Sequence, residues 1–187
     1  MWNIPNTLTL FRLLLIPVFI FLFFMPAPWS LFWAAFTFWL ASVTDLLDGY
    51  LARKLKQSTP FGAFLDPVAD KVMVSVALIV LTHHYQSLYL TIPTIIIISR
   101  EIIVSALREW MAEIGERANV AVSEMGKIKT AAQMLAIIGL TWQYDGHMVT
   151  LSFVLFYVAT ILTFVSMLQY LIAGWGALSQ NKSALGD

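Results

Sequence analysis

Long apolar stretches alternate with short polar breaks along the whole chain. Six stretches, each near the roughly 20 residues that a helix needs to cross a bilayer, occupy residues 7–25, 31–53, 61–82, 88–110, 128–144 and 149–172. The breaks between them contain proline, glycine and other residues that favour turns. This pattern predicts an all-α integral membrane protein with six transmembrane helices in a single domain, residues 1–187.

The composition agrees with that pattern. Of the 187 residues, 59% are hydrophobic and 12% are charged, about half the charged fraction of an ordinary soluble domain. The chain contains no cysteine, which excludes disulfides, thiolate metal sites and cysteine nucleophiles. The formal net charge is zero, so the composition gives no basic surface for nucleic acid.

Lysine and arginine are distributed unequally between the two predicted sides of the membrane. The breaks after the first, third and fifth stretches contain neither, and they hold His83, His84, Asp145 and His147. The opposite side carries Arg53, Lys54, Lys56, Arg117, Lys127, Lys129 and Lys182. Because cytoplasmic loops of membrane proteins are enriched in these cations, we expect this side and both termini to be cytoplasmic.

Four aspartates lie inside the second and third stretches, where an ionised carboxylate costs several kcal/mol unless it is compensated. Asp48 and Asp66 each lie nine positions from Gln57, and Asp45 and Asp70 lie twelve and thirteen positions from it. In an antiparallel helical hairpin these pairs should lie at equal depth, with each helix presenting its acids on one face. Four carboxylates predict a site for hard divalent cations such as Mg²⁺ or Mn²⁺.

The residues between the acids favour an anionic ligand. Gly49 and Ala52 leave little side-chain bulk, and Arg53 follows Gly49 by about one helical turn. Gly62 lies about one turn before Asp66 in the next stretch. An arginine can bind phosphate through its two-pronged guanidinium, so this arrangement predicts a diphosphate bridged by metal ions.

This arrangement resembles the signature of the CDP-alcohol phosphatidyltransferase family, D-x-x-D-G-x-x-A-R, then eight residues, then G-x-x-x-D-x-x-x-D. Every fixed position is present between Asp45 and Asp70. The similarity to one branch of the family extends over nearly the whole chain. It includes residues 3–12, with Asn6, Thr9 and Arg12, and the segments 58–71, 100–109 and 126–130.

The resemblance implies the family fold and a reaction in the bacterial cytoplasmic (inner) membrane, with the active site facing the cytoplasm. The branch transfers a phosphatidyl group from CDP-diacylglycerol to sn-glycerol 3-phosphate, releasing CMP, in phosphatidylglycerol and cardiolipin biosynthesis. The alternative is a sister enzyme that uses serine, inositol phosphate or phosphatidylglycerol as acceptor. A homodimer surrounded by membrane lipids, with no nucleic-acid partner, is the expected assembly.

The resemblance also assigns roles to residues. Two Mg²⁺ or Mn²⁺ ions would be held by Asp45, Asp48, Asp66 and Asp70, with Asp70 also serving as the catalytic base. The CDP and diphosphate site would be lined by Gly49, Ala52, Arg53, Gly62, Asn6 and Thr9. For Asn6, Thr9 and Arg12, the alternative role is to cap and anchor the first helix.

An acceptor that carries its own phosphate needs cationic partners. The candidates are Arg100, Arg108, Lys127 and Lys129, which lie toward the cytoplasmic ends of the fourth and fifth stretches. An ordinary ion pair with Glu101 is the alternative for Arg100, and Arg108 could simply extend to the lipid interface. Lys127 and Lys129 differ by about 200° around a helix, so one of them is expected to face the pocket.

A cation transporter with intramembrane acids is a rival function. It would need carboxylates near the middle of the bilayer and access from both sides. The four aspartates instead lie toward one face, beside glycines and an arginine that would repel cations.

Overall fold

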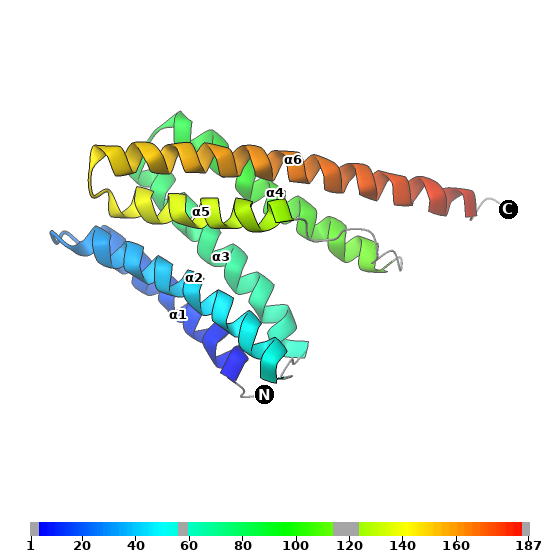
Figure 1. Ribbon diagram of the computed structural model, residues 1–187, viewed down its shortest axis with the longest axis horizontal. Helices are drawn as coiled ribbons and strands as arrows, with labels where there is room; N and C mark the ends of the chain where they lie inside the picture. Colours follow the sequence, from blue (N-terminus) through cyan, green and yellow to red (C-terminus); the bar gives the residue numbers. More distant parts are fainter. Residues whose placement is uncertain (1–3, 56–59, 114–123, 185–187) are drawn as a thin grey trace.

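The computed structural model describes the backbone of residues 4–55, 60–113 and 124–184, and side chains over 6–47, 62, 64–113 and 128–172. Within these ranges the chain forms six helices and no strand. They are α1 (Ile4–Phe24), α2 (Ser30–Leu55), α3 (Pro60–Tyr85), α4 (Leu88–Glu113), α5 (Glu124–Trp142) and α6 (Gly146–Ala184) (Figure 1). Each of the six apolar stretches forms one helix, which confirms the all-α prediction.

Local chemistry explains where several helices begin and end. The Ser87 hydroxyl accepts a hydrogen bond from the Tyr89 amide at the start of α4, and the Asp145 carboxylate accepts one from Met148 at the start of α6. After α3 and α5 the chain turns through residues with positive φ, Gln86 at 45° and Gln143 at 52°. Their amides donate to carbonyls of the preceding helical turn, which ends both helices.

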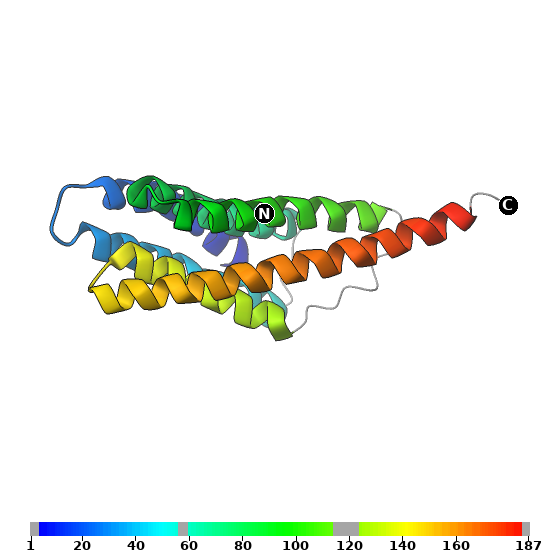
Figure 2. The ribbon, with the colours of Figure 1, turned by 90° about the horizontal axis from the view of Figure 1, so that it is seen from above.

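The three short turns that lack lysine and arginine gather at one end of the molecule. They join α1 to α2, α3 to α4, and α5 to α6, and they lie at the left in Figures 1 and 2. Toward the other end the helices separate into two groups in Figure 1, with α1, α2 and α3 running to the bottom and α4, α5 and α6 to the right. The alternating direction expected from the sequence is therefore present.

The core is apolar and continuous across the bundle. Phe19 of α1, Phe38 of α2 and Phe156 of α6 are fully buried within one cluster of apolar side chains. Helix α1 packs against both α2 and α3, while α5 packs against α2 and α6. Residues of α1 can therefore reach both helices that carry the aspartates.

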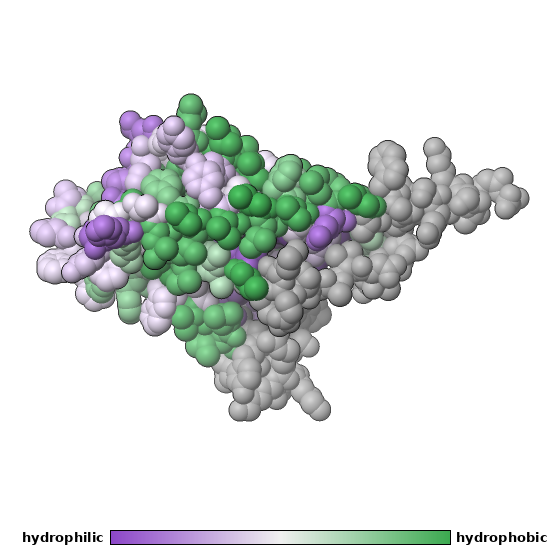
Figure 3. All heavy atoms as spheres, turned by 45° about the horizontal axis from the view of Figure 1, so that its top comes forward, coloured by the Kyte–Doolittle hydropathy of each residue, from purple (hydrophilic) through white to green (hydrophobic). Residues whose placement is uncertain are grey.

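Within the residues whose side chains are described, four helical segments are long and apolar enough to cross a membrane: Asn6–Phe24, Ser30–Leu47, Leu88–Glu113 and Gly146–Ile172. Figure 3 shows hydrophobic residues over the middle of one face, with hydrophilic residues gathered mostly at its left end. The protein is thus a multi-pass membrane protein. Helix α3 carries charges in its first half, and the described apolar part of α5, Ile128–Trp142, is shorter than these four segments.

Candidate active site

The first helix supplies the polar groups that meet the aspartates. Thr9 and Arg12 lie three residues apart on one face of α1, and both are buried, with 0% and 1% exposure. Nη1 of Arg12 lies 2.8 Å from Oδ1 of Asp45 in α2 and 2.6 Å from Oδ1 of Asp70 in α3. The Thr9 hydroxyl donates a hydrogen bond to Oδ1 of Asp66 in α3. Three acids from two helices are thus joined to one face of α1.

Asp45 and Asp70 meet as their equal distance from the interhelical turn predicts. Their carboxylates bind the same nitrogen of Arg12, so they lie at one level of the bundle. The backbones of Asp48, Gly49, Ala52 and Arg53 belong to α2, but their side chains lie outside the described residues. The expected pairing of Asp48 with Asp66 therefore stays a prediction, as does the diphosphate pocket between them.

The acids have the chemistry that a hard divalent cation requires. They are carboxylates, and the side chains of Asp45 and Asp70 are 29% and 41% exposed, so an ion can reach them from outside the bundle. Among the described side chains, no three histidine, aspartate or glutamate groups lie close enough together to hold a metal ion. Arg12 lies between two of the acids, and the side chain of Asp48 is not among those described.

Sequence reasoning weighed two roles for Arg12, contact with the nucleotide or headgroup and anchoring of the first helix, and neither included a contact with the acids. A charged residue inside an apolar stretch, one turn after Thr9, was the available signal that it faces other helices and not lipid. Lys71 follows Asp70 directly in the sequence, a position from which its charge would balance the acids. Its ammonium instead donates a hydrogen bond to the Ser105 hydroxyl of α4.

A second polar cluster joins α4, α5 and α6. Nη1 of Arg100 lies 2.7 Å from Oε1 of Glu101, and Nζ of Lys129 lies 3.5 Å from the same oxygen. Arg100 also donates to the Ser166 hydroxyl at 3.1 Å, and its guanidinium lies 5.9 Å from the centre of the Tyr170 ring. The structure therefore brings Arg100 and Lys129 together through a shared carboxylate.

The other two acceptor-site candidates are placed differently. Arg108 is exposed on α4, eight residues beyond Arg100 or about 12 Å along the helix. Lys127 belongs to α5, but its side chain lies outside the described residues. Lys129 is 7% exposed and points into the bundle. Of the two lysines, it is therefore the one for which the structure shows a contact inside the bundle.

The two polar clusters approach one another along α4. Ser105, which binds Lys71 of α3, lies one turn beyond Glu101 on the same helix face. Lys71 in turn follows Asp70 in α3. The cluster of cations and the helix bearing the acids are thus neighbours.

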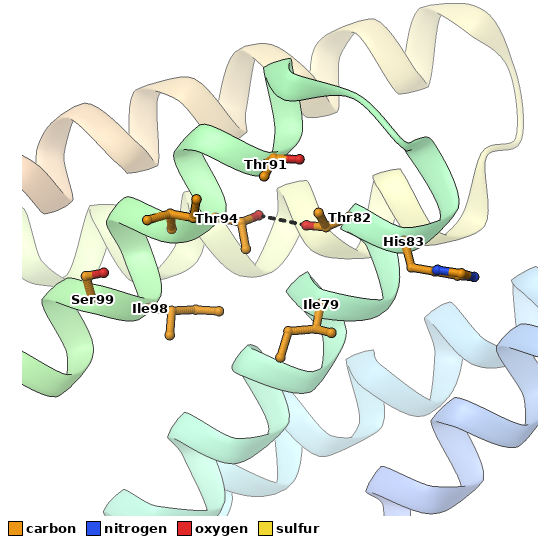
Figure 4. Close-up of a pocket in the computed structure, with 8 residues that line it drawn as sticks. Ile79, Thr82, His83, Thr91, Thr94, Ile98 and Ser99 are labelled. Carbon is orange, nitrogen blue, oxygen red and sulfur yellow. Dashed lines mark hydrogen bonds between the residues drawn. The ribbon is translucent and has the colours of Figure 1, made fainter.

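A cavity of about 480 Å³ between α3 and α4 has a different character. In Figure 4 the hydroxyls of Thr82 and Thr94 face each other, 3.3 Å apart, while His83 points away from them. Apolar atoms make up most of its surface, although threonine, histidine and serine are among the lining residues: Ile79, Thr82, His83, Thr91, Thr94, Ile95, Ile98 and Ser99. Thr82 lies twelve residues beyond Asp70, about 18 Å along α3, so this cavity does not belong to the aspartate site.

The signature from Asp45 to Asp70 and the helices that carry it define a known class of membrane transferase. The family model for CDP-alcohol phosphatidyltransferase matches residues 2–165, and the chain belongs to this family.

Similar proteins in several bacteria extend the comparison over nearly the whole chain. A protein of Haemophilus influenzae named CDP-diacylglycerol–glycerol-3-phosphate 3-phosphatidyltransferase is 57% identical, covering 96% of this chain and 97% of its own. Proteins with the same name from Yersinia pestis and Shigella flexneri are 56% and 55% identical. They cover 94% and 92% of this chain, and 97% and 94% of their own length, respectively.

Proposed function

We propose that this protein transfers the phosphatidyl group of CDP-diacylglycerol to sn-glycerol 3-phosphate, giving phosphatidylglycerophosphate and CMP. The observation that carries the proposal is the complete family signature on α2 and α3, in a chain more than half identical to proteins named for this reaction. The same similarity favours glycerol 3-phosphate over serine, inositol phosphate or phosphatidylglycerol as the acceptor.

The reaction replaces the phosphoanhydride bond of the diphosphate with a phosphate ester bond. The primary hydroxyl oxygen of the acceptor forms a bond to the lipid-side phosphorus, and the bond from that phosphorus to the oxygen of CMP breaks. Asp70 accepts the hydroxyl proton, because an ionised carboxylate beside the acceptor can act as a general base. Direct in-line displacement needs no covalent intermediate on the protein.

Asp45, Asp48, Asp66 and Asp70 would hold two divalent cations, Mg²⁺ or Mn²⁺. When bound, such ions neutralise the diphosphate and the oxygen that leaves with CMP. Charge supports this assignment, since the described acids outnumber the single guanidinium that Arg12 supplies to them. Asn6, Thr9, Gly49, Ala52, Arg53 and Gly62 would line the nucleotide and diphosphate site, and Asn6 and Gly62 are both buried.

The phosphate of the acceptor would bind the cations of α4 and α5. Arg100 and Lys129 carry most of this proposal because both contact Glu101, which shows that the pair accommodates an anion. Arg108 and Lys127 would assist from the cytoplasmic end. If Arg100→Ala and Lys129→Ala both left the KM for glycerol 3-phosphate unchanged, the acceptor assignment would be wrong.

We further propose that all six helices cross the bacterial inner membrane, with both termini and the active site on the cytoplasmic side. Helices α3 and α5 contain 26 and 19 residues, about 39 Å and 29 Å, so α3 exceeds and α5 nearly matches a hydrocarbon core of about 30 Å. A shallow site near the cytoplasmic surface of the membrane lets a lipid-anchored donor meet a water-soluble acceptor. The expected assembly is a homodimer.

One assay tests the proposed reaction directly. Detergent-purified protein is incubated with CDP-diacylglycerol, labelled glycerol 3-phosphate and Mg²⁺ or Mn²⁺, and lipid-soluble label and CMP are followed. Equal amounts of both products are expected, with no turnover in EDTA. Serine, inositol phosphate and phosphatidylglycerol serve as competing acceptors. Preferential transfer to one of them would replace glycerol 3-phosphate with that acceptor.

A further inference from the structure

We infer that Arg12 is a positioning residue, an internal cation that holds Asp45 and Asp70 together in the absence of divalent ions and competes with those ions for the two acids. The inference rests on the proposed function only in taking these aspartates as metal ligands. It concerns a residue of α1, outside the signature segment, and it predicts how the stability of the protein depends on metal.

The geometry of Arg12 supports this role. A single nitrogen, Nη1, lies within 2.8 Å of both carboxylates, one from α2 and one from α3. Its position between two anions is the position that a bridging cation occupies. Since the guanidinium keeps its charge at any working pH, it can hold the acids together permanently when no ion is present.

Burial separates this role from that of an ordinary surface arginine. The side chain of Arg12 is 1% exposed, whereas those of Asp45 and Asp70 are 29% and 41% exposed. Arg12 therefore reaches the acids from inside the bundle, while the two carboxylates stay partly exposed. A snorkelling arginine would instead place its charge at the lipid interface.

Three other cations of the described part of the chain, one of them buried, have different partners. Arg100 and Lys129 contact Glu101, and Lys71 donates to Ser105. Without Arg12, the carboxylates of Asp45 and Asp70 would repel each other across the α2–α3 junction. A divalent ion between the two carboxylates would offset that repulsion.

The test measures thermal unfolding in detergent without substrates, in EDTA and in Mn²⁺. Arg12→Met removes the charge and keeps a long apolar side chain. We expect the unfolding temperature of this variant in EDTA to be well below that of the wild type. Mn²⁺ should raise its unfolding temperature by several degrees more than it raises that of the wild type. Mn²⁺ should also bind it several-fold more tightly by electron paramagnetic resonance, because the guanidinium of Arg12 no longer competes.

Arg100→Met is the matched control, because it also removes an arginine from a carboxylate. This control should unfold at a lower temperature than the wild type in EDTA. Mn²⁺ should raise its unfolding temperature no more than it raises that of the wild type. The inference would be overturned if Mn²⁺ raised the unfolding temperature of Arg12→Met only as much as that of the wild type, or only as much as that of Arg100→Met.

Arg12→Gln, which keeps a polar side chain, is the second variant in case Arg12→Met does not fold. If Arg12→Gln also fails to fold in Mn²⁺, Arg12 supports packing that no ion can replace, and the inference is overturned.

Failure of the proposed function would be seen in the wild-type protein and not in the Arg12 variants. Wild-type protein that binds no Mn²⁺ would remove the metal assignment itself, and wild-type protein that forms no phosphatidylglycerophosphate would remove the reaction.

Discussion

The hydroxyl of Thr9 in α1 binds Oδ1 of Asp66 in α3, across 57 positions of the chain. This hydrogen bond fixes one oxygen of the carboxylate and directs it toward the first helix. Thr9 is fully buried, so water cannot easily take its place. A helix outside the family signature therefore helps to orient an acid that belongs to the signature.

Replacing Thr9 by valine should weaken the active site without creating a large cavity, because the two side chains have nearly the same shape. A hydrogen bond to a charged group contributes about 1.5–3 kcal/mol. We therefore expect kcat/KM for CDP-diacylglycerol to fall roughly tenfold or more. Thr9→Ser keeps the hydroxyl and should retain most of the activity. Equal losses in both variants would indicate that packing matters here and not the hydrogen bond.

Asp70→Asn should abolish most turnover while leaving metal binding largely intact, because the other aspartates remain. General base catalysis contributes about 10²–10⁴-fold, so a fall in kcat of at least about 100-fold is expected. Single-turnover assays should be combined with Mn²⁺ binding measured by electron paramagnetic resonance. Retained turnover would remove Asp70 as the base, and lost Mn²⁺ binding would leave it with a ligand role alone.

Glu101→Gln should reveal whether Arg100 and Lys129 form an anion site. Loss of the carboxylate leaves two largely buried cations without their shared partner, so we expect destabilisation of about 1–2 kcal/mol. Glycerol 3-phosphate should then raise the unfolding temperature of this variant more than that of the wild type, since its phosphate replaces the missing anion.

The control for this experiment is Glu109→Gln, an exposed change on the same helix. Its unfolding temperature and its response to glycerol 3-phosphate should match those of the wild type. If the ligand stabilises Glu101→Gln and wild-type protein equally, the cation pair does not bind the acceptor phosphate.

Gly139→Ala should destabilise the packing of α5 on α6. A Cβ atom at this position would lie 1.9 Å from Oγ and 3.1 Å from Cβ of Ser152 in α6. Because rotation of the hydroxyl relieves the first contact but not the second, a loss of about 1–3 kcal/mol is expected. Thermal unfolding in detergent measures it.

Gly146→Ala is the matched substitution for Gly139→Ala. A Cβ atom at Gly146 would have no atom within 4 Å, so its stability should stay within about 0.5 kcal/mol of the wild type. A similar loss at both glycines would show that the close approach of α5 to α6 does not set the effect.

Much of the fold could be predicted because its determinants are local. Each apolar stretch is long enough to form a helix by itself, and the turns between stretches contain their own capping residues, such as Ser87 and Asp145. The family signature is also local, since every fixed position lies between Asp45 and Asp70. The equal depth of Asp45 and Asp70 followed from counting along two helices joined by one short turn.

The sequence by itself determined six helices, the turns that share one end, and the acidic signature that defines the family. Only the tertiary structure decided which cation meets which acid: Arg12 reaches Asp45 and Asp70, Lys71 binds Ser105, and Glu101 joins Arg100 to Lys129. Hydrophobic periodicity and signature spacing are set by neighbours along the chain. The partners of a long side chain depend instead on how helices far apart in sequence pack and rotate against one another.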